Sequence, residues 1–177
     1  IILFQEKMGM GLVYEFEKAR RIRQSLHPED GLALSRVCMQ IHDTEKALNL
    51  AARPYLNRCL LVCQGLCCRN VFLNEIIGFE DFLYILSLMP DLDVEIENRL
   101  KNLNRLFTAD CIFLEDSSGP CIFPADIRPE VCITSFCIET PNASRQIGAV
   151  KWGFQKLAWA VRLCRARTFF RKIGLIR

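Results

Sequence analysis

The stretch Cys59-Leu-Leu-Val-Cys63-Gln-Gly-Leu-Cys67-Cys68 and a second group of cysteines further along together hold eight of the ten cysteines in this 177-residue chain. Thiolates gathered in this way are soft, negatively charged ligands suited to a metal ion or an iron–sulfur cluster. We therefore predict a metal centre built from both groups. Its predicted ligands are Cys59, Cys63, Cys67, Cys68, Cys111, Cys121, Cys132 and Cys137.

Disulfide bonds are the less favoured use of these cysteines. Adjacent Cys67 and Cys68 cannot bond each other without strain, and secreted disulfide proteins usually spread their cysteines along the chain. This pattern predicts a reducing compartment, the cytoplasm. The apolar run at residues 1–4 is too short for a signal peptide, and no run of about 18 apolar residues predicts a transmembrane segment.

The rest of the chain predicts a helical scaffold. Apolar residues recur at three- and four-residue steps, with charged residues between them, and are expected on the covered face of each helix. Leu32, Ala47 and Val94 are among these predicted apolar positions. Pro54 is expected to end or bend the second helix, because proline lacks the N–H and disfavours helix at the preceding residue. The predicted helices cover residues 10–26, 29–52, 80–89, 92–106 and 143–173.

Residues 108–140 have a different composition, rich in Pro, Gly, Ser and β-branched residues. They predict an irregular loop, with a turn at residues 117–120 that would suit a short β-hairpin. The predicted fold class is mainly α: a small helical domain with an irregular Cys-rich metal-binding loop. We expect one domain over 1–177, made of a helical scaffold (1–58), a Cys-rich core (59–137) and a basic C-terminal helix (138–177).

Charge is distributed unevenly along the chain. All 20 acidic residues lie at or before Glu139, and nine of the 23 basic residues follow it. The basic C-terminal helix could contact an acidic protein partner, an acidic membrane surface or nucleic acid, of which nucleic acid is the less favoured. A solvated face is the default interpretation. Its aromatic residues are expected in the core or an interface. They are Trp152, Phe154, Trp159, Phe169 and Phe170.

Several residues outside the two cysteine groups are less favoured as ligands. Cys38 and Cys164 fall on apolar helix faces and are predicted as core residues. His27 and His42 have no neighbouring ligand in the sequence, so each is expected to cap or decorate a helix. Asp110 is expected at a turn or helix cap.

A set of motifs follows the first cysteine group in a fixed order: Cys67-Cys68-Arg69, Cys111-Ile112-Phe113-Leu114, Gly119-Pro120-Cys121, Arg128-Pro129-Glu130-Val131-Cys132 and Phe136-Cys137. This order resembles the YkgJ-type (CxxCxxCC) family of zinc- or iron-chelating domains. The resemblance covers residues 59–137 and implies cysteine-bound zinc or iron. It departs in the first group, where three residues rather than two separate the cysteines. Some members look like flagellin lysine methylases, but the Gly-rich nucleotide loop of such enzymes is not found here.

Zinc and an iron–sulfur cluster both remain open as the bound species. Zinc ribbons favour Cys-x2-Cys pairs, which this chain lacks, whereas iron–sulfur ligands have more varied spacings, so we favour a [4Fe–4S] cluster. Arg69 and Arg128 lie close to the ligands in sequence and are predicted to stabilise the negative charge of the centre. The predicted role is structural or electron transfer, as a subunit of a larger complex. A zinc-binding protein and a metal-dependent enzyme are the alternatives.

Overall fold

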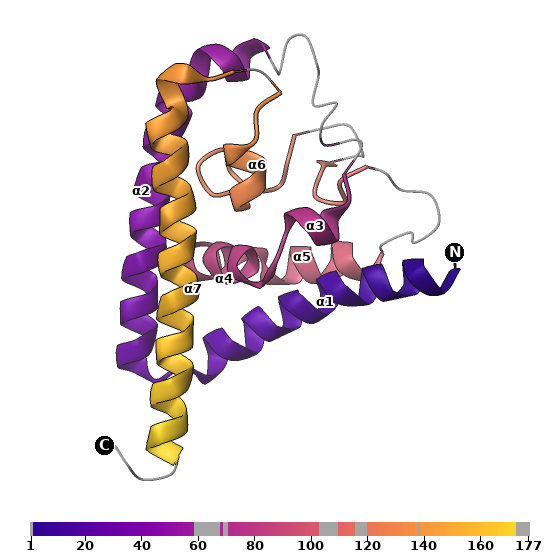
Figure 1. Cartoon of the computed structure of the whole chain (residues 1–177). Coiled ribbons are helices and arrows are strands. Elements are labelled where there is room, and N and C mark those ends of the chain that lie inside the picture. Colours follow the sequence, from indigo (N-terminus) through magenta and orange to yellow (C-terminus); the bar gives the residue numbers. More distant parts are fainter. Residues whose placement is uncertain are drawn as a thin grey trace.

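Two long helices, α2 (Pro28–Arg58) and α7 (Ser144–Lys172), lie side by side and run in opposite directions in the computed structural model (Figure 1). The structure describes residues 2–58, 68, 71–102, 110–115, 120–137 and 139–172. Of these, the side chains of residues 2–10, 56–58 and 172 are not described. Within these residues the chain is mainly helical and forms no β-strand, which confirms the predicted fold class.

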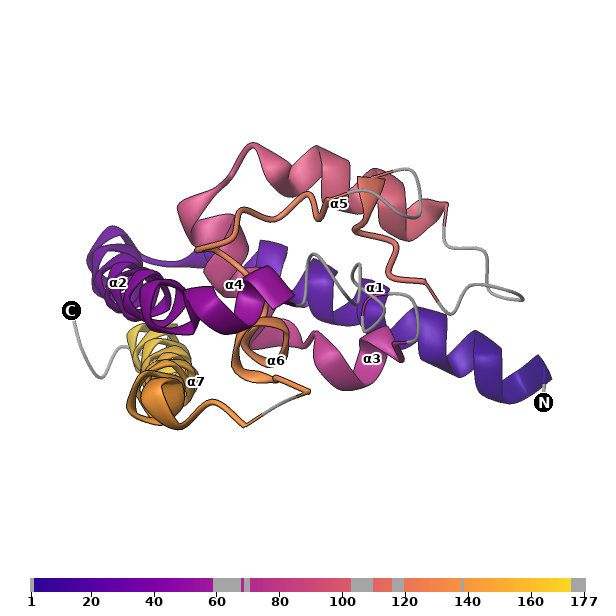
Figure 2. The same ribbon diagram turned by 90° about the horizontal axis from the view of Figure 1, so that it is seen from above.

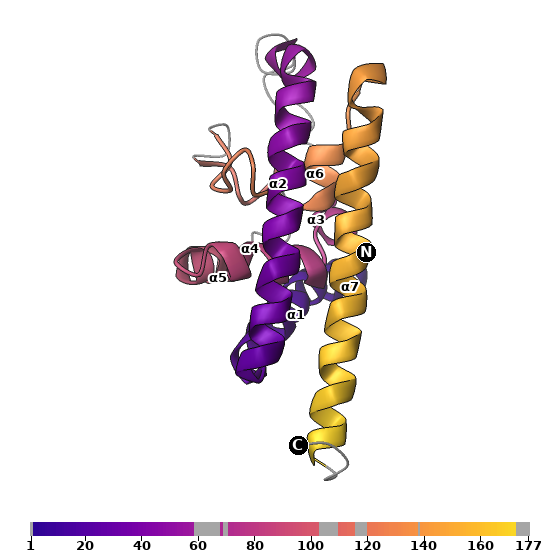
Figure 3. The same ribbon diagram turned by 90° about the vertical axis from the view of Figure 1, so that its left-hand side faces the viewer.

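The remaining elements lie on one side of the α2–α7 pair (Figures 1 and 2). Figure 3 views the molecule from the side of the α2–α7 pair, and there α2 and α7 form the front layer. Helix α1 packs against α4, and α4 also contacts both long helices. The other elements are α1 (Ile2–Ser25), α3 (Leu73–Ile76), α4 (Phe79–Leu88), α5 (Leu92–Lys101), α6 (Glu130–Thr134) and the 3-10 turn η4 (Pro141–Ala143).

Pro28 begins α2, and Pro54 bends it near its C-terminal end (Figure 1). Pro28 is the first helical residue, where its missing N–H and fixed φ angle are favourable, and acidic residues follow it in the first turn. Pro54 lies inside the helix, which continues to Arg58, and Figure 1 shows the last turns bending away from the long axis. The predicted bend is therefore found, and the helix does not end there. Pro54 and Leu50 are exposed, so water can reach the carbonyl that loses its hydrogen bond.

The core confirms most of the predicted apolar positions. Phe16 of α1, Phe82 of α4, and Phe113 and Phe123 of the Cys-rich loop form one aromatic row, with successive ring centroids 5.4, 6.4 and 4.8 Å apart. This row attaches the loop to the helices. The predicted core residues Cys38 and Cys164 are also buried.

Some predicted apolar positions are wrong. Leu32 and Ala47 of α2 and Val94 of α5 are exposed, because other elements cover only one side of each helix. Of the five aromatic residues of α7 named above, only Phe154 is buried. None of the described helices combines the length and hydrophobicity needed to cross a bilayer.

The Cys-rich loop is irregular, as predicted. In the described part of the loop, one isolated antiparallel bridge pairs Leu114 with Cys121. The N–H of Glu115 donates to the carbonyl of Pro120, and the N–H of Ile122 donates to that of Phe113, both at 2.9 Å. The short helix α6, which the sequence pattern did not predict, begins after Pro129.

Candidate metal centre

Cysteines from three segments that are distant in sequence come together. The N–H of Cys111 donates to the carbonyl of Cys68 at 2.7 Å, which joins the first cysteine group to the loop. Burial, together with negative charge on Cys121 and Cys68, raises the pKa of the Cys111 thiol to about 11. The pKa of Cys132 on α6 is raised by desolvation, and then by charge on Cys111, Asp81, Cys121 and Cys68. We call Cys68, Cys111, Cys121 and Cys132 the four-thiol group.

Accessibility differs within the four-thiol group. Cys68, Cys111 and Cys121 are half-buried, whereas Cys132 is exposed as a whole residue. The surrounding protein nevertheless raises the pKa of the Cys132 thiol by desolvation. Burial therefore keeps the thiols of Cys111, Cys121 and Cys132 neutral at pH 7 unless a cation replaces their protons.

Arg99 of α5 is a basic residue of the site that the sequence pattern missed. Its Nη1 donates to the carbonyls of Ile112 and Leu114, at 3.0 and 2.7 Å. Its charge lowers the pKa of Cys111 and of Cys121, against the larger opposite effect of burial. The only sequence signal at Arg99 is its i,i+4 pairing with Glu95, which is typical of any exposed helix and points to no ligand.

Arg128, which the sequence predicts near the metal, lies close enough to Cys121 for its charge to act on that thiol. Its charge lowers the pKa of Cys121, again against the larger effect of burial. Its Nε atom is buried and has no hydrogen-bond partner among the described residues. A buried guanidinium nitrogen without an acceptor is unfavourable unless negative charge lies near it. A thiolate-bound metal centre would supply that charge, so this residue fits such a centre.

A buried carboxylate, Asp81, positions the helix that carries Cys132. Its Oδ2 accepts a hydrogen bond from the N–H of Gly78 at 2.8 Å, at the start of α4. Its Oδ1 accepts one from the N–H of Glu130 at 2.7 Å, at the start of α6. Burial raises the pKa of Asp81 to about 6 in spite of both hydrogen bonds. One side chain therefore caps two helices and joins them.

A hollow of about 410 Å³ opens beside Cys111. It gives solvent and small solutes a route to one edge of the four-thiol group. Its walls are polar except at Ile112 and Leu114. The polar lining residues are Glu95, Asn98, Arg99, Asn102, Asp110 and Cys111.

The structure also describes Cys137, His27, His42 and Asp110. Cys137 is exposed, three residues after α6. His27 is exposed near Glu29, and His42 contacts Asp126 at 3.1 Å, which ties α2 to the Cys-rich loop rather than decorating a helix. Asp110 lies at a bend, as expected. Four predicted residues lie outside the described part of the chain: Cys59, Cys63, Cys67 and Arg69.

The donors in the described ranges do not form a complete site for one ion. No group of three or more His, Cys, Asp or Glu side chains there is close enough to hold a metal ion. The soft sulfur donors and the two nearby guanidinium groups match the chemistry of a thiolate centre. No family model matches the chain, and neither a curated protein nor a solved structure is significantly similar to it.

Proposed function

We propose that this is a cysteine-rich metal-binding protein that holds an iron–sulfur cluster in a structural or electron-transfer role. The observation that carries the proposal is the hydrogen bond from the N–H of Cys111 to the carbonyl of Cys68, together with the bridge between Leu114 and Cys121, which join cysteines of both groups. Charge on these thiols also raises the pKa of Cys132. Four cysteine ligands are the usual set for a [4Fe–4S] cluster. The resemblance to the YkgJ-type family and the cytoplasmic location remain predictions that agree with it.

Arg99 and Arg128 would balance the charge of the bound centre. A metal centre with four thiolate ligands carries net negative charge, and nearby guanidinium groups stabilise it. Arg99 is held in place by two loop carbonyls, and Arg128 has a buried Nε atom that is free to donate among the described residues. When bound, an iron–sulfur cluster supplies reversible one-electron chemistry, and the hollow beside Cys111 brings solutes close to it.

Zinc is the alternative metal, and with four cysteine ligands it would give a structural site. The absence of a Cys-x2-Cys pair from the sequence favours iron over zinc. A metal-dependent enzyme related to flagellin lysine methylases is a second candidate. The hollow of about 410 Å³ beside Cys111 favours it, since a substrate needs room next to the metal.

Metal analysis of protein purified without oxygen tests the proposal. We expect iron and acid-labile sulfide in equal amounts and broad visible absorption. Cys111→Ser and Cys121→Ser should each lose most of the iron. Cys164→Ala is the matched control, because Cys164 is a buried thiol on α7 outside the four-thiol group, and it should keep its iron.

Each other outcome rejects a defined part of the proposal. Zinc without iron would reject the redox role and leave a structural zinc protein. Full metal content in Cys111→Ser and Cys121→Ser would reject the four-thiol group as the ligand set. Electron paramagnetic resonance spectra that change when a small substrate is added would favour the enzyme, because this requires an open coordination position.

A further inference from the structure

Helix α7 exposes a line of large apolar side chains between Trp152 and Phe170. Trp152 and Trp159 are each 60% exposed, and Leu163, Phe169 and Phe170 are 57%, 58% and 42% exposed. Trp152, Trp159, Leu163 and Phe170 follow one another at seven-, four- and seven-residue steps, so they share one face of the helix. That face lies opposite the buried residues Phe154, Leu157 and Val161. It extends over about 27 Å, at about 1.5 Å per residue.

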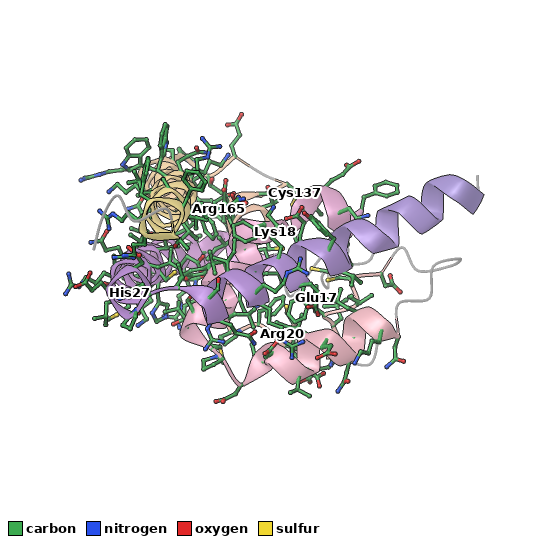
Figure 4. The ribbon with its side chains drawn as sticks, turned by 90° about the horizontal axis from the view of Figure 1, so that it is seen from below. Glu17, Lys18, Arg20, His27, Cys137 and Arg165 are labelled. Carbon is green, nitrogen blue, oxygen red and sulfur yellow. The ribbon has the colours of Figure 1, made fainter. Side chains whose placement is uncertain are left out.

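Basic residues accompany this line. The ammonium group of Lys156 lies 5.9 Å from the ring of Trp152, and the guanidinium group of Arg162 lies 5.4 Å from the ring of Trp159. Lys151 and Arg165 are exposed on the same helix, and Figure 4 shows Arg165 on α7. No acidic residue follows Glu139 in the sequence. The exposed face of α7 is therefore aromatic and uniformly positive.

Helix α2 adds a second line of exposed apolar side chains to the same layer. Leu32, Met39 and Leu50 are 63%, 57% and 73% exposed and lie opposite the buried stripe of α2. Because α2 and α7 lie side by side and the other elements pack on one side of them, the pair forms an outer layer of the molecule (Figure 3).

We propose that this α2–α7 layer binds the surface of an anionic lipid bilayer. Tryptophan and phenylalanine favour the boundary between headgroups and acyl chains, and lysine and arginine favour anionic headgroups. Each indole here has a cationic neighbour, so both preferences are met side by side. In protein interfaces the anchor residues gather at a centre surrounded by a polar rim. The apolar residues of α7 are instead spread along a line of about 27 Å, which suits a flat partner.

The two tryptophans make the test direct, because Trp152 and Trp159 are the only ones in the chain and both lie on the proposed surface. The full chain is titrated with vesicles of phosphatidylcholine alone and with vesicles containing about 30% phosphatidylglycerol, at about 50 mM salt. We expect a blue shift of the emission only with the anionic vesicles. Lipids brominated on their acyl chains should quench this emission, which places the indoles at the acyl boundary.

Two sets of variants separate the contributions. Lys156→Gln with Arg162→Gln, the two cations beside the indoles, should weaken vesicle binding by about tenfold or more, from the usual contribution of a basic residue near an anionic surface. Trp152→Ala with Leu163→Ala should weaken it through loss of apolar contact. The matched controls are Arg21→Gln, on α1, and Val94→Ala, on α5, which are equally accessible and lie outside the layer. These controls should bind like the wild type.

The remaining outcomes overturn the proposal. Absence of any emission change with anionic vesicles at low salt would do so directly. Equal binding to neutral vesicles, or no effect of Trp152→Ala with Leu163→Ala, would reject a specific anionic surface. Displacement from vesicles by an equal charge of single-stranded DNA would favour nucleic acid instead. Self-association that the same alanine variants abolish would identify a second copy of the chain as the occupant.

Discussion

At the scale of single residues, buried carboxylates control how this protein responds to pH. Burial opposes ionisation of Asp30, but hydrogen bonds from Arg171 and Arg167 hold its pKa below the ordinary value. Glu45 lies on α2 with an Oε1 atom that has no hydrogen-bond partner among the described residues, and burial raises its pKa to about 8. The two carboxylates therefore make stability change with pH in opposite ways.

Asp30→Asn should lower the free energy of unfolding by about 1–3 kcal/mol at pH 7, because the two arginines lose a buried carboxylate partner. The folded pKa of Asp30 is depressed, so its contribution is present above the unfolded pKa and is lost as the pH falls through the folded pKa. Urea unfolding at pH 7 and at about pH 3 checks this. The difference between wild type and variant should shrink in acid. Glu29→Gln, whose carboxylate is exposed, should change little.

Glu45→Gln should make the protein more stable than the wild type in mild alkali. The folded pKa of Glu45 is raised from 4.5 to about 8, so its contribution is fully present below the unfolded pKa and is lost as the pH rises toward 8. Glutamine is neutral at every pH and still offers an oxygen to the N–H of Arg128, which lies 3.2 Å from Oε2. The denaturation curves of the wild type and the variant should lie closer together at about pH 5 than at about pH 9. An equal gap at both pH values would contradict this assignment.

At the scale of elements, the contact between α2 and α7 depends on one glycine. A Cβ atom at Gly153 would lie 2.8 Å from Cγ1 of Ile41, which is fully buried and stiff at its branched β carbon. A Cβ atom at Gly148, on the same helix, would meet no described atom within 4 Å.

Gly153→Ala should therefore destabilise the protein by about 1–2 kcal/mol, because overpacking outweighs the gain in helix propensity. Gly148→Ala should stabilise it by about 0.5–1 kcal/mol, because only the propensity gain remains. The pair is compared by urea denaturation followed by circular dichroism. If both variants gained stability, the close approach of α2 and α7 at Ile41 would be wrong.

The sequence predicted the long helices well because their apolar residues repeat at helical spacing. It did not predict α6, because this helix has only five residues and its first turn is held by Asp81 from another element. It also assigned Leu32 and Val94 to covered faces that the fold leaves open. Short-range pattern identifies a helix, but which of its faces is buried depends on what packs against it.

The residues of the candidate metal centre were likewise predictable only where the local sequence carries their chemistry. The two cysteine groups and Arg128 could be found in the sequence, because thiols and a neighbouring basic residue carry their chemistry with them. Arg99 could not be found, since it approaches Cys111 and Cys121 only through the packing of α5 against the loop. Arg20 of α1 contacts Asp93 and Glu97 of α5 at 3.1 and 3.0 Å. These ion pairs hold α5 against α1, on which Figure 4 labels Arg20.

At the scale of the whole molecule, removing the metal should destabilise the segment around the proposed metal centre more than the long helices. Removing the metal from anaerobically purified protein should expose residues 110–137 to proteases, because this irregular segment has little core of its own. The far-ultraviolet circular dichroism should change little, since most helical residues lie in α1, α2 and α7. Mass spectrometry of the first cleavage products locates the cut. Cleavage within α2 or α7 first would contradict this separation.

The aromatic row from Phe16 through Phe82 and Phe113 to Phe123 links the first helix to the Cys-rich loop. A cavity made at Phe16 would loosen rings that hold the loop, although Phe16 belongs to another segment of the chain. Screens for inactive variants of this protein should therefore recover substitutions in α1 that reduce iron incorporation and leave every cysteine intact.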